Sequence, residues 1–263
     1  MSLQKSKIKM RYIGSKTLML ENIEHVIKQC THNVHTITDI FAGTGAVSKH
    51  LKKKGYSILS NDILYMSYVL NKGTLEMNAP ISKKLREIIA HLNNLTTANS
   101  PWFDIETAFI YQNYSPNNHC NRMYFQCDNA LKIDLVRQGI ERLKNEIAET
   151  EYYYLLALLL GAVPYVSNIT GTYGAYLKYW DKRTYNPLTL EEIEIVPSEI
   201  RCQCFNLNAT DFARQIECDL VYLDPPYNGR QYLPNYHILE TIARYDYPEI
   251  KGVTGIRVYP QRM

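Results

Sequence analysis

The sequence predicts an α/β protein whose parallel sheet is interrupted by a long, mostly helical insertion. The first observation is a strand, a helix and a second strand within about 30 residues, between positions 36 and 60. Such a βαβ unit implies parallel strands. The second is a third apolar run, 219–223, separated from that unit by a long stretch with mostly helical or irregular patterning. A stretch of that length cannot be one crossover connection, so an inserted domain is expected.

The βαβ unit follows a helix that the apolar spacing predicts over residues 18–29. The β-branched run 36–41 predicts a buried strand, and it enters a tight turn at Ala42-Gly43-Thr44-Gly45. A helix over 46–54 stops at a glycine, and residues 56–60 predict the second strand. Together these segments predict the first half of the sheet.

The boundaries of the insertion are predicted from the change in pattern. Residues 1–72 and 198–263 are expected to form the domain that carries the sheet, and residues 73–197 the inserted domain. Within the insertion, one helix is predicted over 81–93 and a long helical stretch over 130–163, interrupted near Gly139 or Thr150.

After the insertion the pattern returns to strands. Residues 200–205 read as sheet-like sequence, and residues 219–223 predict a clearly buried strand. A helix is predicted over 233–245, and residues 252–258 contain one strand at most.

Composition excludes several classes of protein. Of the 263 residues, 46% are hydrophobic and 21% charged, which excludes global disorder. The longest apolar run, 155–163, is far shorter than the ~18 residues that span a bilayer, and the N-terminus lacks an apolar signal core. The six cysteines lack the spacing of a disulfide framework or a zinc site. We therefore expect a cytoplasmic protein with reduced thiols, no membrane partner and no metal.

Charge and tyrosine are unevenly distributed. Residues 1–72 hold 11 Lys and Arg against 4 Asp and Glu, a net charge of +7, whereas residues 73–200 hold 11 against 15, a net charge of −4. A basic block can attract a polyanion or can be a solvated helix face. Of the 22 tyrosines, 11 lie between Tyr111 and Tyr185, where they can stack on bases or fill a core.

The glycine turn and an acidic residue after the next strand indicate an adenosine-containing ligand. Phe41-Ala-Gly-Thr-Gly45 follows a strand and opens a helix, so its backbone can approach a ligand closely. It matches neither G-x-G-x-x-G nor the P-loop. Asp62, at the end of the second strand, stands where a carboxylate accepts two ribose hydroxyls. The alternative is a tight turn followed by a helix-capping aspartate.

Asp224-Pro225-Pro226-Tyr227, after the third predicted strand, is the most informative motif. Two prolines fix φ and remove two backbone donors, which leaves the Asp224 carboxylate and the Pro225 carbonyl as acceptors. Acceptors without donors suit a planar exocyclic amine, whose nitrogen becomes nucleophilic when both its hydrogens are bound. The Tyr227 ring can stack on the base. The alternative is an ordinary turn after a strand.

These motifs resemble those of the DNA amino-methyltransferases that use S-adenosylmethionine, specifically the adenine-N6 class called D12, or Dam-like. Four motifs occur in that family's order: Arg11-Tyr-Ile-Gly-Ser-Lys16, Phe41 to Gly45, Asn61-Asp62 and Asp224 to Tyr227. Asn208-Ala-Thr-Asp211 looks like a further motif, and the stretch from Asn228 resembles members of restriction–modification systems. The resemblance covers both flanks and leaves the middle unmatched. It implies a Rossmann-like methyltransferase sheet with a target-recognition insertion.

Carried over residue by residue, the resemblance implies contacts to S-adenosylmethionine from the residues of these motifs, which are Tyr12, Lys16, Phe41, Gly43, Gly45, Asp62, Asp211 and Asp224. Lys16 would lie near the cofactor's carboxylate or the DNA backbone, or would be a solvated lysine. Tyr12 would pack near the cofactor or in the core. Asp211 would lie near the cofactor's adenine, although Asn208 and Asp211 suit equally well as caps of a helix beginning at Phe212. The catalytic set would be Asp224, Pro225, Pro226 and Tyr227.

The implied substrate is double-stranded DNA, from which the target base must be flipped. The Tyr-rich insertion is expected to supply stacking and groove contacts. Because the insertion is acidic, contacts to the phosphate backbone are expected from residues 5–16 and 49–54 and from dispersed arginines. A cognate restriction endonuclease is a possible partner.

The C-terminal part departs from the family pattern. Only 36 residues follow Tyr227 (263 minus 227), fewer than the further strands of such a sheet need. We therefore expect missing C-terminal strands, supplied by self-association or by a completing polypeptide, because an open sheet edge tends to pair. Two alternatives stay open: a methyltransferase acting on cytosine N4 or on RNA, and a catalytically impaired relative that acts as a DNA-binding module.

Overall fold

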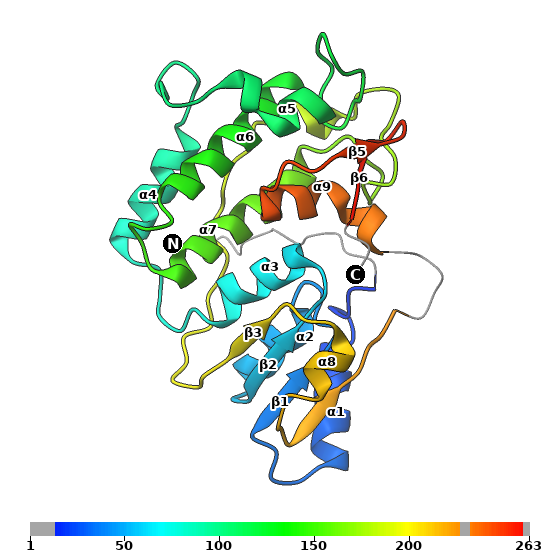
Figure 1. Ribbon diagram of the computed structural model, residues 1–263. Coiled ribbons are helices and arrows are strands. Elements are labelled where there is room, and N and C mark those ends of the chain that lie inside the picture. The colour runs from blue at the N-terminus through cyan, green and yellow to red at the C-terminus, as the bar shows by residue number, and fades with distance from the viewer. Residues whose placement is uncertain (1–13, 227–231, 260–263) are drawn as a thin grey trace.

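A parallel four-stranded sheet forms one layer of the computed structural model, which describes residues 14–226 and 232–259. The strand order is β3-β2-β1-β4, and all three pairings are parallel (Figure 1). The strands are β1 (Thr36–Asp39), β2 (Ser57–Asn61), β3 (Gln203–Phe205) and β4 (Leu220–Tyr222). This confirms the predicted α/β class and its parallel sheet.

Two helices from the N-terminal part pack on this sheet. They are α1 (Leu20–Cys30) and α2 (Ala46–Lys53), and their apolar residues share one cluster with Ile37 of β1 and Ile58 of β2, both 0% exposed. The helix α2 ends before Gly55, whose φ of +94° is one that residues with side chains rarely adopt. The short helix α8 (Ala209–Ala213) starts three residues before the predicted Phe212, because the side chain of Asn208 accepts the N–H of Thr210 at 2.9 Å.

A second layer of helices lies above the sheet in Figure 1. It contains α3 (Tyr65–Leu75), α4 (Lys83–Asn93), α5 (Phe109–Tyr114), α6 (Cys127–Arg142), α7 (Glu149–Ala162) and α9 (Tyr232–Arg244). The described chain also contains short 3-10 helices at Ile105–Thr107, Val163–Tyr165 and Lys182–Tyr185. Buried residues of all six helices belong to one hydrophobic cluster. The domain boundary expected at residue 72 falls inside α3, and the division into two domains stays a prediction.

The predicted long helical stretch is broken once. It separates into α6 and α7 between Arg142 and Glu149, near Thr150 and not at Gly139. Gly139 lies inside α6, where a Cβ atom would approach side-chain atoms of Leu92 and Leu95 to 3.0 Å. Gly139 is therefore a position of close contact between α6 and its neighbours, and the helix does not end there.

Two expectations about burial are wrong, and the choice left open for the tyrosines is partly decided. The strand β4 is not clearly buried: it pairs only with β1 among the described strands, and Val221 and Leu223 are 44% and 61% exposed. Lys52, expected at a phosphate-binding face, is 2% exposed, and its Nζ donates to the carbonyl oxygens of Leu75, the last residue of α3, and of Met77. Several tyrosines of the insertion fill the core. Four of them are at most 1% exposed: Tyr114, Tyr124, Tyr154 and Tyr173.

The C-terminal part contains a pair of short strands where one strand at most was predicted. β5 (Ile250–Lys251) and β6 (Ile256–Arg257) form an antiparallel hairpin that turns at Gly252 and Gly255, both at positive φ. The Arg122 guanidinium binds the carbonyl oxygens of Gly252 and Val253 and so holds the turn against the helical layer.

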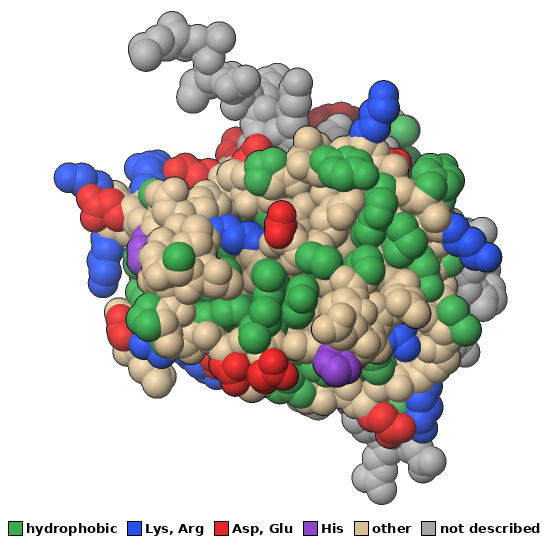
Figure 2. Space-filling model, turned by 90° about the horizontal axis from the view of Figure 1, so that it is seen from above, with side chains coloured by type: hydrophobic (Ala, Val, Ile, Leu, Met, Phe, Trp, Pro, Cys, Tyr) green, Lys and Arg blue, Asp and Glu red, His purple; other side chains and the backbone are tan. Residues whose placement is uncertain are grey.

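Charged side chains are sparse on the face of the helical layer that Figure 2 shows from above. Hydrophobic side chains are scattered over that face, and most Lys and Arg side chains lie toward its edge. None of the helices in the described ranges combines the length and the apolar character needed to cross a membrane.

Gly73 provides a test of the contact between α3 and α7. A Cβ atom at this position would lie 2.4 Å from the carbonyl oxygen of Tyr153, a backbone atom that cannot move aside cheaply. Helix propensity alone predicts that Gly→Ala stabilises by about 1 kcal/mol. We expect Gly73→Ala to destabilise the protein instead, by about 1–3 kcal/mol, measured by urea unfolding. Gly171→Ala, where a Cβ meets nothing within 4 Å, is the control and should change stability by less than about 1 kcal/mol.

Candidate active site

A cavity of about 580 Å³ lies where β1, β2 and β4 end. Asp39 is the last residue of β1, Asp62 follows β2 and Asp224 follows β4, and all three line the cavity. Carboxyl ends of parallel strands meet at one edge of a sheet, and ligands of open α/β folds bind there. The size is within the range of small-molecule and cofactor sites. The fold thus brings together acids that lie far apart in the chain.

The glycine turn forms one wall of the cavity. Phe41 and Gly43 line it, and Gly43 and Gly45 have φ of +54° and +74°. Gly45 is not among the lining residues, but a Cβ there would lie 2.1 Å from Oδ1 of Asn71. Asn71, on α3, donates its side-chain N–H to the carbonyl of Gly43 at 3.0 Å. Gly45 therefore allows the turn and α3 to approach each other.

Asp62 connects the glycine turn to the start of α3. Its Oδ2 accepts the N–H of Gly43 and its Oδ1 the N–H of Leu64, both at 2.8 Å. The residue is 9% exposed, and burial raises the pKa of its carboxyl to about 6, although both hydrogen bonds act in the opposite direction. A carboxylate has about four acceptor sites, so two backbone donors leave room for ligand hydroxyls.

Asp39 is an acid in the cavity that the sequence analysis did not single out. Its Oδ2 accepts the Ser48 hydroxyl at 2.7 Å, whereas its Oδ1 is buried without a hydrogen-bond partner in the described structure. Burial, aided by the charges of Asp62 and Asp224, raises the pKa of Asp39 to about 7. The sequence signal was present, because an acid in the last strand position before the glycine turn must lie at the ligand edge.

The third acid is paired with Lys16. Nζ of Lys16 lies 2.5 Å from Oδ2 of Asp224, and both side chains are partly exposed, at 20% and 27%. Pro225 and Pro226 continue the wall after Asp224. The structure thus brings Lys16 to the catalytic motif that the sequence predicted. Tyr12 and Tyr227, the other predicted residues of these two motifs, lie outside the described residues.

Three tyrosines and a leucine that were not predicted as site residues complete the cavity. Tyr222 of β4, Tyr232 and Leu233 of α9, and Tyr259 after β6 all line it. Tyr259 donates its hydroxyl to the carbonyl of Leu233 at 2.9 Å, which closes the C-terminal segment onto α9. Burial raises the pKa of Tyr222 to about 12, so this hydroxyl stays neutral. No sequence pattern indicated this wall, because its parts come from three separate elements.

Asp211 is not brought to the cavity. It lies in the first turn of α8, its side chain is 63% exposed, and it pairs with Arg214 at 3.9 Å. Its role as a contact to an adenine ring stays a prediction.

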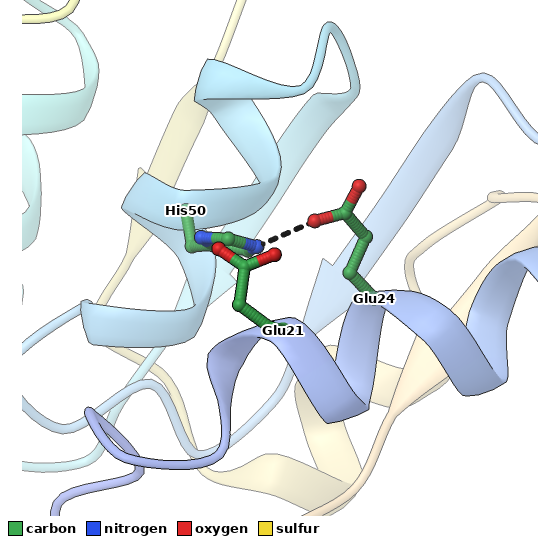
Figure 3. Close-up of side chains that lie close together, drawn as sticks. All are labelled: Glu21, Glu24 and His50. Atoms are coloured by element: carbon green, nitrogen blue, oxygen red, sulfur yellow. Dashed lines mark hydrogen bonds and ion pairs between the residues drawn. The ribbon is translucent and has the colours of Figure 1, made fainter.

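A second group of titratable side chains, two glutamates and a histidine, lies outside the cavity, between α1 and α2. Glu21, Glu24 and His50 place ligand-type atoms within 4.8 Å of one another (Figure 3). Both carboxylate oxygens of Glu24 are already engaged, by Lys28 at 2.6 Å and by His50 and Lys54 at 2.8 Å. The group is therefore an ion-pair cluster that joins the two helices.

Comparison with known proteins identifies relatives over nearly the whole chain. The family model for D12 class N6 adenine-specific DNA methyltransferases matches residues 12–263. The chain is 46% identical to the type II methyltransferase M.FokI of Planomicrobium okeanokoites and 42% identical to the modification methylase StsI of Streptococcus sanguinis. These alignments cover 95% and 94% of this chain, which spans only 39% and 38% of those relatives.

A shorter relative is covered more fully. The type II methyltransferase M.NlaIII of Neisseria lactamica is 38% identical over 255 residues, which are 95% of this chain and 74% of that protein. No solved structure matches the chain.

Gly45 provides a test of the turn's geometry. Gly45 and Gly55 both have positive φ, so alanine strains the backbone by about 1 kcal/mol at either position. Only at Gly45 does a Cβ also collide with a neighbour, since nothing lies within 4 Å at Gly55. We expect Gly45→Ala to lower the free energy of unfolding by about 2 kcal/mol more than Gly55→Ala, measured by urea unfolding. Equal losses would show that the contact with Asn71 is unimportant.

Proposed function

Since the chain belongs to the D12 class of N6 adenine-specific DNA methyltransferases, we propose that it transfers a methyl group from S-adenosylmethionine to N6 of adenine in a specific DNA sequence. The observation that carries the proposal is the meeting of Asp62, Lys16 and Asp224 in one cavity. The names of M.FokI and StsI, a type II methyltransferase and a modification methylase, support a place in a restriction–modification system.

The residues of the cavity fit S-adenosylmethionine. Asp62 offers acceptors to ribose hydroxyls, and the glycine turn leaves space beside Phe41 and Gly43. The unpartnered Oδ1 of Asp39 suits an ammonium group, and Lys16 suits a carboxylate. When bound, the cofactor supplies a methyl group on a positively charged sulfur. This requires no metal from the protein.

Asp224 and the two prolines are proposed to hold the target amine. The Asp224 carboxylate accepts one amino hydrogen and the Pro225 carbonyl the other, while the prolines present no competing N–H. Binding both hydrogens directs the nitrogen lone pair out of the ring plane toward the methyl group. On methyl transfer the new nitrogen–carbon bond would form as the donor's carbon–sulfur bond breaks and leaves its electron pair on sulfur, and the surplus amino proton would pass to the Asp224 carboxylate. Lys16, paired with Asp224, is placed to balance the charge of that carboxylate.

The target base must leave the duplex to reach Asp224, at a cost of a few kcal/mol. Tyr227 is the proposed stacking partner, and the aromatic wall of Tyr222, Tyr232 and Tyr259 adds further ring faces. Residues 73–197 are proposed to read the target sequence. Because the insertion is acidic and Figure 2 shows no broad basic patch on the face that it draws, phosphate contacts are assigned to residues 5–16, to residues 49–54 other than the buried Lys52, and to dispersed arginines. A cognate endonuclease and self-association remain proposals.

Asp224→Ala tests the catalytic assignment. The substitution removes an acceptor from the amine while leaving the apolar packing around it, so DNA affinity should change little. We expect methyl transfer from tritiated S-adenosylmethionine to fall by at least about 10²- to 10³-fold, the scale of losing one well-placed polar group. The control is Glu217→Ala, an exposed carboxylate between α8 and β4 that does not line the cavity, which should transfer normally. Turnover near the wild-type rate would remove Asp224 from the mechanism.

The nature of the methylated base is tested separately. Digestion of the methylated DNA to nucleosides should yield N6-methyladenine and no N4-methylcytosine. N4-methylcytosine would favour the alternative base, because the same acceptors suit either exocyclic amine. Cofactor and DNA binding without transfer to any DNA or RNA would favour a catalytically impaired binding module.

The pKa of Asp62 predicts how cofactor affinity depends on pH. The ionised carboxylate accepts the ribose hydroxyls, and burial raises the pKa of Asp62 to about 6. Protonation of Asp62 should therefore weaken the affinity for S-adenosylmethionine as the pH drops through about 6, measured by calorimetry. In Asp62→Asn, affinity should be about tenfold weaker at pH 8, and this dependence should disappear. An unchanged acid limb in the variant would assign it to another group, of which Asp39 is the nearest candidate.

A further inference from the structure

The residue at the N-cap position of α3 supplies no side-chain cap. Leu64 occupies the position before the helix, where Ser, Thr, Asp or Asn would normally supply an acceptor. The first N–H groups of a helix lack intrahelical partners and must be satisfied elsewhere. Two buried carboxylates do this here: Asp62 accepts the N–H of Leu64, and Glu240 accepts those of Tyr65 at 3.1 Å and Met66 at 2.9 Å.

Glu240 reaches α3 from α9, the helix that follows the catalytic motif. It is 0% exposed, and its one side-chain cation partner among the described residues is Arg244, whose Nε lies 2.6 Å from Oε1. The Arg244 guanidinium also lies over the Tyr65 ring, 5.1 Å from its centre. A buried carboxylate is tolerated only when it is well paired, and the positive end of the helix dipole adds to this pairing.

This arrangement links the cofactor acid to α9. The N–H of Leu64 donates to Asp62. The N–H groups of the next two residues, Tyr65 and Met66, donate to Glu240. A shift of the helix start would move the donor on which Asp62 depends. The first turn of the same α9 carries Leu233 and Pro234 into the cavity wall. The element α9 therefore borders the cavity with its first turn and, beyond a kink at the non-helical Tyr236 (φ −124°, ψ 16°), holds the start of α3 through Glu240.

We propose that Glu240 is a positioning residue for the cofactor site: by capping α3 from α9 it holds Asp62 in the orientation that binds the ribose. The inference rests on the proposed function. It goes beyond fold stability, because a glutamate needed only for stability would affect cofactor affinity no more than any other buried, ion-paired glutamate.

Glu24 is such a glutamate and provides the matched control. It is 5% exposed, it is paired with Lys28, Lys54 and His50 between α1 and α2 (Figure 3), and it does not line the cavity. Glu24→Gln and Glu240→Gln both replace a buried, paired carboxylate by an amide of the same shape. In Glu240→Gln, however, the side-chain NH₂ group would face the backbone N–H of either Tyr65 or Met66, so a donor would meet a donor and that hydrogen bond would be lost.

The experiment is calorimetric titration of the full chain with S-adenosylmethionine at pH 8. We expect Glu240→Gln to bind about tenfold more weakly than wild type, and Glu24→Gln to bind within about twofold of wild type, at a temperature where both are folded. Equal affinities for Glu240→Gln and wild type would overturn the proposal. If the wild-type chain itself does not bind the cofactor, it is the proposed function that fails.

Two further measurements keep the test decisive if Glu240→Gln is poorly folded. Arg244→Met leaves the carboxylate but removes its guanidinium clamp, and should weaken cofactor binding about threefold. Hydrogen exchange of the amides of residues 64–66 should accelerate in either variant and stay unchanged in Glu24→Gln. Protected amides at 64–66 together with wild-type affinity in Arg244→Met would contradict the proposal.

The pH profile adds a readout that a merely structural role would not change. The acids that face Asp62 are Asp39 from β1 and Glu240 from α9, and the charge of Glu240 contributes to the raised pKa of Asp62. In Glu240→Gln the acid limb of cofactor binding should therefore move to lower pH. An acid limb at the wild-type pH would count against direct coupling between the two carboxylates.

Discussion

The hydrogen bonds of the buried Asp62 carboxylate are the constraint on which the rest of the site depends. One oxygen binds the glycine turn at Gly43 and the other binds Leu64 at the start of α3. The turn comes from β1 and the acid from β2, so these two bonds hold neighbouring strand ends in register with the helix above them. Without them, a carboxylate that is 9% exposed would face a large desolvation cost.

The helix α3 is where the sheet and the helical layer meet, and buried charges from other elements satisfy both of its ends. At its start, Asp62 and Glu240 accept backbone N–H groups, and at its end Nζ of Lys52 donates to the carbonyl oxygens of Leu75 and Met77. Negative groups at the start and a positive group at the end also suit the helix dipole. Gly73 then lets α7 approach closely. The position of the proposed cofactor site thus depends on packing in the helical layer.

The charges inside the cavity are divided between two tasks. Asp39 and Asp62 are buried near the glycine turn, where burial raises both pKa values, whereas Asp224 is partly exposed and paired with Lys16. The first two acids are proposed to serve the cofactor and the third the target amine. This division follows from the positions of the strands, because β1 and β2 end beside the turn and β4 ends at the opposite side of β1.

The sequence by itself determined the α/β class, the parallel strands and the motifs at their ends, because strand periodicity, glycine turns and Asp-Pro-Pro depend on local chemistry. It predicted Asp62 and Asp224 from their positions after strands and Lys16 through a family resemblance, and all three line the cavity. Only the tertiary structure showed that Asp39 and the aromatic wall belong there, that Lys52 and much of the tyrosine are buried, and that Glu240 caps α3. These features join residues up to 175 positions apart, and burial and long-range hydrogen bonds leave no periodic signal in the chain.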